Sequence, residues 1–323
     1  MTRFEDTRFT TESFAPIAVA TRSDFDESLH FGAGVVLGGN GAVEFELGDA
    51  DVVVYPRSCL KPLQADAMIA AGVELTGEQL AVACASHGGW PAHLAIVRSI
   101  LTDCGLDERA LRCPAVWPLS PEARDLQIRR GVRTRRRIFH NCSGKHAAML
   151  GACIAQGWPT DSYLDPAHPL QQQIVDAVEV ATGIRPEPVG VDGCGAPTLR
   201  GSVRGLARAF ASLSSNTRFA TATRAISRFP SLVADNARAD GVLGRWWGGP
   251  VKVGAEGQVG VGRHGIGIAA KAAAGGSEVA VAAVIAVARD LGLVSDAMFD
   301  GLALQSAPPV FGGGVPVGAL ARN

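Results

Sequence analysis

Short segments rich in apolar and β-branched residues cluster near the start of the chain. Gly39-Asn-Gly41 separates two of them and has the composition of a tight turn. Alternating segments divided by such turns are typical of antiparallel strands. The pattern therefore predicts a meander after a polar tail at residues 1–14, with strands at residues 16–22, 32–37, 42–47 and 51–55.

From residue 60 onward, apolar positions recur at helical spacing instead. Thr76, followed three residues later by Gln79, is typical of a helix start, and His168 is expected to open another helix. The spacing predicts helices over 60–72, 92–104, 121–131, 144–156, 168–182, 199–213 and 217–228. Near the other end, it predicts two strands and a helix, at residues 250–262, 265–274 and 278–291.

Strands grouped at both chain ends, with helices between them, favour an α+β fold over alternating βαβ units. We expect one antiparallel sheet built from both ends, with flanking helices and a mostly helical insert. The predicted organisation is a single catalytic unit over 15–323. Its sheet subdomain spans about 15–60 and 245–323, and its helical subdomain about 61–244.

The composition narrows the class of protein. The 323 residues carry a net charge of −1, which argues against a dedicated nucleic-acid binder. The first residues have no apolar stretch of the secretory type, and no run reaches the length of a membrane span. Seven cysteines, an odd number, argue against a disulfide framework. These features predict a soluble cytoplasmic protein without a nucleic-acid or membrane partner.

The basic residues are unevenly chosen, because only four of the 30 are lysines: Lys61, Lys145, Lys252 and Lys271. A lysine can lose its proton when it is buried, whereas arginine stays charged. Codon bias explains the count equally well unless the lysines coincide with chemical motifs.

Ser58 and Lys61 form the first such motif, Ser-x-x-Lys. On a helix this spacing places both side chains on one face, where a neutral lysine could take the proton of a serine nucleophile. The motif alone also arises by chance. Two companions follow in the order of penicillin-recognising enzymes: Ser86, in the glycine-rich turn Cys84-Ala-Ser-His-Gly-Gly, and Lys252, in Lys-Val-Gly.

Cys142 and Cys194 form a second constellation, because each lies in a polar, glycine-containing segment. Two thiolates can bind a soft divalent ion such as zinc, leaving places for a nitrogen and a water. Lys145 or His146 could supply the nitrogen. The alternative is a pair of buried structural cysteines.

Taken in order, these segments resemble the Rhizobium etli-type asparaginase II family. The resemblance rests on Arg57-Ser-x-x-Lys-Pro, Cys84-Ala-Ser-His, Asn141-Cys-Ser-Gly-Lys-His, Asp192-Gly-Cys and Lys252-Val-Gly-Ala-Glu, and runs from about residue 27 to the end. That family is similar in fold to serine β-lactamases and glutaminases. It hydrolyses L-asparagine to aspartate and ammonia.

The resemblance implies a set of roles for residues of this chain. Two serine–lysine tandems, Ser58–Lys61 and Ser86–Lys252, would be catalytic, with Ser58 as the nucleophile. Arg57, His146 and Asp192 would bind the substrate. One zinc per chain would be held by Cys142, Lys145, Cys194 and a water, and would orient groups rather than act as a Lewis acid. A homodimer is also implied.

Two segments depart from the family pattern. Gly88-Gly89-Trp90 stands where the family usually has Ser and Glu, and Val233-Ala-Asp-Asn-Ala-Arg238 replaces a glycine-containing Val-Ala-Gly-x-Gly-Arg. The alternatives to an asparaginase are a glutaminase, another serine amidohydrolase or penicillin-recognising enzyme, and a catalytically weak zinc- or amino-acid-binding homologue.

Overall fold

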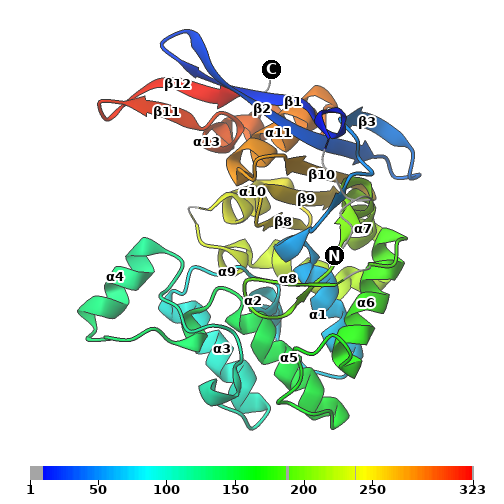
Figure 1. Cartoon of the computed structure of the whole chain (residues 1–323), viewed down its shortest axis with the longest axis vertical. Coiled ribbons are helices and arrows are strands. Elements are labelled where there is room, and N and C mark those ends of the chain that lie inside the picture. The colour runs from blue at the N-terminus through cyan, green and yellow to red at the C-terminus, as the bar shows by residue number, and fades with distance from the viewer. Residues whose placement is uncertain (1–9, 187–188, 237, 322–323) are drawn as a thin grey trace. The chain divides into compact units, whose positions relative to one another are not determined.

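The structure is a computed structural model that describes residues 10–186, 189–236 and 238–321. Residues 1–9 of the predicted tail and Ala237 of the second departing segment lie outside the described residues. The chain forms two compact units (Figure 1). The sheet unit comprises Met1–Cys59, Arg200–Thr217 and Val242–Asn323. The helical unit comprises Leu60–Leu199 and Arg218–Gly241.

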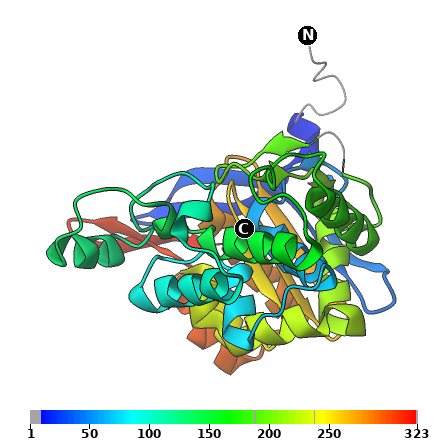
Figure 2. The same cartoon turned by 90° about the horizontal axis from the view of Figure 1, so that it is seen from below.

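The sheet unit is built on an antiparallel sheet that, over the described residues, has eight strands in the order β11-β12-β1-β2-β10-β9-β8, with β3 also paired to β2. The strands are β1 (Ala15–Arg22), β2 (Phe25–Leu37), β3 (Val43–Leu47), β8 (Val251–Gly254), β9 (Gln258–Arg263), β10 (Ile266–Ala272), β11 (Pro309–Gly312) and β12 (Val315–Ala321). Val19 of β1 pairs with Ala321 of β12, so the two chain ends are neighbours in the sheet. The blue and red strands lie side by side in Figures 1 and 2. The predicted α+β class, with a sheet drawn from both ends, is confirmed.

Some strand predictions were wrong in detail. Residues 250–262, predicted as one strand, form the hairpin β8–β9, because Glu256 and Gly257 both adopt left-handed backbone conformations that reverse the chain. Residues 51–55 were expected in the meander. Instead, β4 (Val53–Val54) pairs with β7 (Gly201–Ser202) in a separate ladder. The strand predicted at 32–37 is only the end of β2.

Two helices of the sheet unit cover opposite faces of the sheet. α7 (Val203–Ser215) contacts β9, β10 and β2, while α11 (Ser277–Asp290) contacts β10, β1 and β9. Gly267 faces α7, whereas the adjacent Ile268 lines a cavity with Val284 of α11. Successive strand residues point to opposite faces, so the core is divided into two layers. The remaining helices near this unit are α10 (Ala239–Trp247), α12 (Asp296–Gly301) and α13 (Ala303–Ser306).

The helical unit begins where a 3₁₀ turn, η2 (Arg57–Leu60), leads into α1 (Lys61–Ala70). The Thr76 prediction is confirmed, since its hydroxyl accepts from Gln79 N and the Gln79 side chain accepts from Thr76 N. His168 also opens its helix, because Nδ1 accepts from Leu170 N. The other elements are α2 (Gly77–Ala83), α3 (Pro91–Asp103), α4 (Pro121–Arg129), α5 (Ser143–Gln156), α6 (Pro169–Thr182), α8 (Ala220–Arg228), α9 (Pro230–Val233), β5 (Gly190–Val191) and β6 (Pro197–Thr198).

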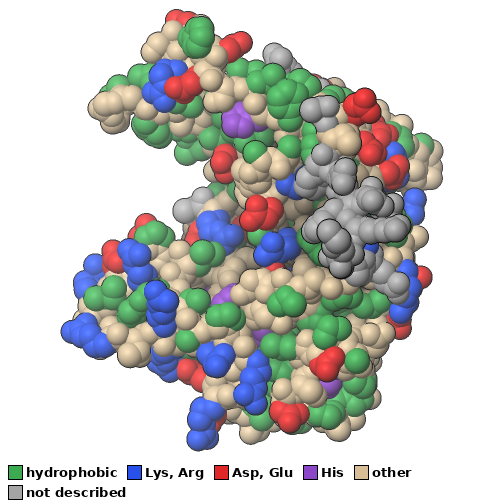
Figure 3. Space-filling view, viewed as in Figure 1, with side chains coloured by type: hydrophobic (Ala, Val, Ile, Leu, Met, Phe, Trp, Pro, Cys, Tyr) green, Lys and Arg blue, Asp and Glu red, His purple; other side chains and the backbone are tan. Residues whose placement is uncertain are grey.

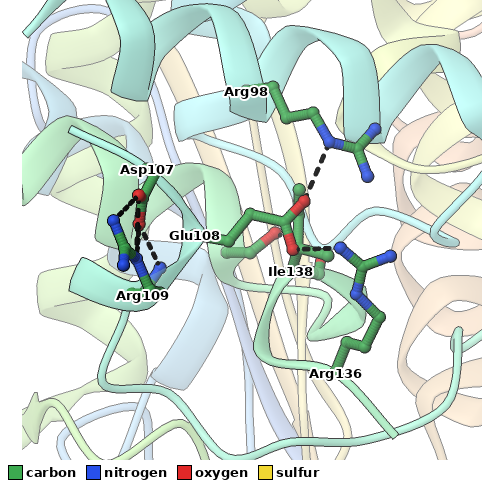
Figure 4. A network of polar contacts seen from close by, with 7 residues as sticks. Arg98, Asp107, Glu108, Arg109, Arg136 and Ile138 are labelled. Atoms are coloured by element: carbon green, nitrogen blue, oxygen red, sulfur yellow. Dashed lines mark hydrogen bonds and ion pairs between the residues drawn. The ribbon is translucent and has the colours of Figure 1, made fainter. Parts of the chain in front are cut away.

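The surface of the helical unit is rich in arginine, and basic side chains gather over α3 and α4 in Figure 3. The cluster is partly neutralised. Glu108 accepts hydrogen bonds from both Arg98 and Arg136, and Asp107 pairs with Arg109 (Figure 4). Exposed pairs of this kind contribute little stability each. Among the described helices, none has the length and apolar character needed to cross a membrane.

Candidate active site

Ser58 lies in η2, directly after a strained residue. Arg57 has φ +54°, a left-handed conformation that costs an ordinary side chain about 1 kcal/mol or more. Within the sheet unit, the Cys59 thiol donates to the carbonyl of Lys252 at 3.2 Å. The turn that carries Ser58 therefore packs against β8, the strand that carries Lys252.

Gly254 of β8 also lies against this turn. A side chain there would approach the Pro56 carbonyl to 2.6 Å and the Cys59 sulfur to 3.1 Å. The Lys252 ammonium is fully buried, and Nζ donates to the carbonyl of Val253 at 2.9 Å. In the sequence Lys-Val-Gly, Lys252 thus supplies a buried amine. Gly254 has no side chain, so η2 can pack closely against β8.

Ser86 and Lys61 are in direct contact within the helical unit. Lys61 opens α1, Ser86 lies in the turn after α2, and Nζ donates to the Ser86 hydroxyl at 3.0 Å and to the Ala85 carbonyl. Both side chains are buried. The resemblance pairs Ser86 with Lys252, so the contact between Ser86 and Lys61 is an additional link that sequence spacing did not predict.

The Ser86 backbone is held by the segment that departs from the family pattern. Ser86 N donates to the carbonyl of Val233 at 2.9 Å, and its own carbonyl accepts from the Arg238 guanidinium. Arg238 N in turn donates to Asp235 Oδ1 at 3.0 Å. The altered segment therefore positions the serine loop directly.

His87 has no role in the sequence-based prediction. Its Nε2 lies 2.9 Å from the Ser143 hydroxyl, which donates to the carbonyl of Ile138, so Nε2 carries the imidazole proton. The buried Nδ1 has no hydrogen-bond partner among the described residues. Burial, followed by the neighbouring His93 and Lys61, lowers the pKa of His87 well below its ordinary value. A neutral imidazole therefore lies beside the catalytic candidates.

The predicted cysteine site is assembled in the helical unit. Cys142 precedes α5, Lys145 lies in its first turn, and Cys194 lies in the loop after β5. Lys145 Nζ donates to Cys194 Sγ at 3.4 Å, and all three side chains are buried. The cluster therefore joins two segments about 50 residues apart.

Cys142 and Cys194 affect each other's ionisation. A hydrogen bond from Cys194, assisted by the nearby Lys61 and Lys145 side chains, lowers the pKa of Cys142 well below its ordinary value despite burial. The same hydrogen bond raises the pKa of Cys194. Burial acts to lower the pKa of Lys145, but the adjacent Cys194 and Cys142 outweigh it and raise the value. The cluster thus combines a thiol of lowered pKa, Cys142, with an amine of raised pKa, Lys145.

The three predicted substrate-binding residues have different surroundings. His146 is fully buried, with Nδ1 2.7 Å from the Tyr163 hydroxyl, while its Nε2 has no hydrogen-bond partner within the described ranges. Asp192 is half-buried, and Cys194 Sγ donates to its Oδ2 at 3.6 Å. Arg57 is half-buried beside Ser58. Tyr163, which fixes the His146 ring, carries no sequence signal.

The donor set at Cys142 fits zinc in its chemistry. Two thiolates and the Lys145 amine leave one place for water in a four-coordinate site. Within the described ranges, no group of three or more His, Cys, Asp and Glu side chains could hold a metal ion. A zinc site here therefore depends on Lys145 as its third protein ligand.

Lys61 and Ser86 are thus a buried lysine and a buried serine joined by a hydrogen bond. This arrangement is typical of serine enzymes that cleave amides and esters through an acyl intermediate. A model of the L-asparaginase II family matches residues 18–322, nearly the whole chain. The chain belongs to this family. Family membership supports an amidohydrolase.

Other comparisons add less. No curated protein matches the chain significantly. Crystal structures of Mglu, of Mglu in its glutamate form and of Mglu in its native form match with TM-scores of 0.45, 0.46 and 0.46 at 15, 15 and 16 % identity. They cover 81, 82 and 81 % of this chain, which spans 67, 61 and 64 % of the Mglu chains.

Proposed function

We propose that this protein is an L-asparagine amidohydrolase that releases aspartate and ammonia through a serine acyl-enzyme. The observation that carries the proposal is the buried contact between Lys61 Nζ and Ser86 Oγ, in a chain of the L-asparaginase II family. A lysine in this setting can exchange a proton with a hydroxyl, which is the central requirement of the reaction.

In the proposed mechanism Ser58 is the nucleophile. Neutral Lys61 takes the hydroxyl proton while the serine oxygen bonds to the side-chain carboxamide carbon. Backbone N–H groups in η2 and the first turn of α1 would stabilise the oxyanion, a contribution of about 3–4 kcal/mol per donor in other enzymes. The proton then passes through Ser86, with Lys252, to the leaving nitrogen as the C–N bond breaks. Water hydrolyses the ester by the reverse proton path and restores Ser58.

The contact between Lys61 and Ser86 gives this relay a physical basis. Lys61 would pass the proton received from Ser58 to Ser86, whose hydroxyl it already contacts at 3.0 Å. Arg57, His146 and Asp192 are proposed to bind the amino-acid part of the substrate. Their charges and hydrogen-bonding atoms suit an α-carboxylate and an α-ammonium group.

Ammonia release tests the nucleophile. Ser58→Ala should lower kcat for asparagine by about a thousandfold or more, because no group replaces the attacking oxygen. Wild-type protein quenched during turnover should carry one aspartyl group on the peptide containing residue 58. The exposed Ser162 provides a matched control, and Ser162→Ala should turn over asparagine like the wild type. Near-normal turnover by Ser58→Ala would contradict the mechanism.

We also propose one zinc per chain, held by Cys142, Lys145, Cys194 and water. When bound, it would fix the cysteine loop and orient Asp192 and His146 rather than act as a Lewis acid. Metal analysis of purified protein should give about one zinc per chain, lost in Cys142→Ser and kept in Cys153→Ser, a buried cysteine of α5. A metal-free wild type would contradict the proposal.

A further inference from the structure

The buried imidazole of His87 joins the loop that carries Ser86 to the segment that opens α5. His87 follows Ser86 directly and has no exposed surface. Its backbone N–H donates to the carbonyl of Asn141 at 3.1 Å, and its Nε2 lies 2.9 Å from the Ser143 hydroxyl. All four residues belong to the helical unit. The serine loop is therefore bonded to this segment twice, once through its backbone and once through the ring.

Ser143 is an anchor for this ring. Its hydroxyl donates to the carbonyl of Ile138 at 2.9 Å, so it accepts the proton of His87 Nε2. The next residue, Gly144, lies so close to Val82 of α2 that a methyl group would overlap the Val82 carbonyl. The first turn of α5 and the last turn of α2, neighbours in Figure 1, are therefore in direct contact. Ser143 thus holds the ring at a fixed position beside α2.

The other nitrogen of the His87 ring brings no stability. Among the described residues, Nδ1 has no hydrogen-bond partner although it is buried. A buried polar atom left in this state costs about 1–3 kcal/mol, a cost that a leucine of similar volume would avoid. Within the described chain, the ring makes its one hydrogen bond from Nε2 to Ser143, and it stacks on His93 with 5.2 Å between ring centroids. The role of the ring therefore lies in what that hydrogen bond holds in place.

The contact between Lys61 and Ser86 depends on the path of the same loop. Lys61 Nζ donates to the Ser86 hydroxyl at 3.0 Å and to the carbonyl of Ala85. Both acceptors belong to the two residues that precede His87. A hydrogen bond to oxygen rarely exceeds about 3.2 Å, so a loop shift of about 1 Å would break the contact.

We propose that His87 and Ser143 are positioning residues, whose hydrogen bond holds the Ser86 hydroxyl in contact with Lys61 Nζ. This inference rests on the proposed function, in which a proton passes from Lys61 through Ser86 to the leaving nitrogen. Both positioning residues act through the serine loop and need no contact with the substrate. All the residues that carry the inference lie in the helical unit.

Loss of this hydrogen bond should affect turnover rather than substrate binding. His87→Leu replaces the ring by an apolar side chain of similar volume. It should lower kcat for asparagine by about 10- to 100-fold, the range expected when a catalytic group is displaced by about 1 Å. KM should stay within about threefold of the wild type, because Arg57, His146 and Asp192 are proposed to bind the substrate.

His87→Gln is the matched control for the hydrogen bond. A glutamine amide nitrogen can reach the position of Nε2 and donate to Ser143, so kcat should return to within about threefold of the wild type. Ammonia release from asparagine, measured below the thermal midpoint of each variant, gives both kcat and KM. A purely structural role of the ring would lower the thermal midpoints and leave kcat of the folded variants unchanged.

Ser143→Ala tests the other partner of the bond. It should lower kcat by a factor similar to that of His87→Leu. The double variant should have a kcat no lower than the worse single variant, because both changes remove the same hydrogen bond. Thr182→Val, at a buried hydroxyl of α6, supplies the control pair. It should leave kcat unchanged, alone or in combination with His87→Leu.

The outcomes separate this inference from the proposed function. A wild type that releases no ammonia from asparagine overturns both. With an active wild type, an unchanged kcat in folded His87→Leu overturns this inference alone, and so do equal losses in His87→Leu and His87→Gln. Additive losses in the double variant also overturn it. If His87→Leu does not fold, Ser143→Ala decides by the same criterion, and an unchanged kcat in that variant overturns the inference.

Discussion

The four lysines are each buried, with at most 5 % of the residue exposed. Lys61 contacts Ser86, Lys145 contacts Cys194, and Lys252 lies on the strand that packs against the Ser58 turn. Lys271 is different. Its ammonium donates to the carbonyls of Glu256 and Ala272, and so ties the β8–β9 turn to the end of β10. In all four cases the protein encloses the lysine side chain.

Lys61→Arg should lower kcat for asparagine by about 10²- to 10⁴-fold, since arginine cannot act as the neutral base. Lys271→Arg is the matched control, because it replaces a buried lysine whose ammonium donates to backbone carbonyls. It should lower the thermal midpoint while kcat stays within several-fold of the wild type. Steady-state ammonia release and thermal unfolding provide both measurements. If Lys61→Arg and Lys271→Arg lowered kcat equally, codon bias would explain the small number of lysines.

The sequence motifs nominate residues for the candidate site, but they do not predict which of these residues contact one another. The motifs around Ser86 and Cys142 combine polar residues with glycine, and the Ser58 motif combines a serine and a lysine at helical spacing; all three can be read directly from the sequence. The contact of Lys61 with Ser86 joins the start of α1 to the loop after α2, 25 residues further along the chain. Nothing in local spacing encodes it, because it depends on how α1 and α2 pack.

At the scale of elements, the closeness of α7 to the sheet depends on glycines of β9 and β10. A methyl group on Gly267 would lie 2.0 Å from the Ala207 carbonyl, and one on Gly262 would lie 2.1 Å from the Phe210 carbonyl. The helix backbone therefore rests directly on the strands. Such contact leaves no room for a side chain between the two layers.

Gly267→Ala should lower the free energy of unfolding by about 1–3 kcal/mol, because the added methyl group forces α7 away from β10. Gly34→Ala is the matched control in the same sheet, since a methyl group there meets only atoms at 3.6 and 3.8 Å. Its effect should be small or slightly stabilising. Denaturant unfolding of both variants gives the comparison, and equal destabilisation would refute the close-packing argument.

Element prediction succeeded where patterns were long and bounded by caps. The helices opened by Thr76 and His168 were found because their first turns carry recognisable side chains. β11 and β12 were missed, since glycines and prolines interrupt the apolar pattern of residues 308–318. Their pairing is fixed by contact with β1, which a local pattern cannot report.

At the scale of the whole molecule, buried neutral histidines make stability depend on pH. Burial is the main cause that lowers the pKa of both His87 and His93 in the folded protein. The unfolded chain takes up protons near pH 6.5, whereas these folded imidazoles do not. The stabilising contribution is therefore complete above about pH 6.5 and is lost as pH falls below it.

His87→Gln should make the free energy of unfolding less dependent on pH between about 6.5 and 5. The slope should fall by up to about 1.4 kcal/mol per pH unit, because one proton uptake on unfolding is removed. Urea unfolding at several pH values measures the slope. His30→Gln, at a partly exposed histidine of β2, is the control. An unchanged slope in His87→Gln would contradict the buried neutral state.

The predicted homodimer and cytoplasmic location stay predictions. Sedimentation at several protein concentrations would test the first. The structure does show that the sheet unit is built from three separate stretches of the chain.

Because the sheet unit is built from three separate stretches, its strands are synthesised at different times. The β1–β2 hairpin leaves the ribosome before β10 and β12, the strands that pair with its two edges. At bacterial or eukaryotic synthesis rates the delay before residue 321 emerges is on the order of 15–60 s. During that time the helical unit can fold while the nascent hairpin keeps two open edges, which chaperones would have to shield. The edge of β1 is covered only when the seven-residue strand β12 has been synthesised.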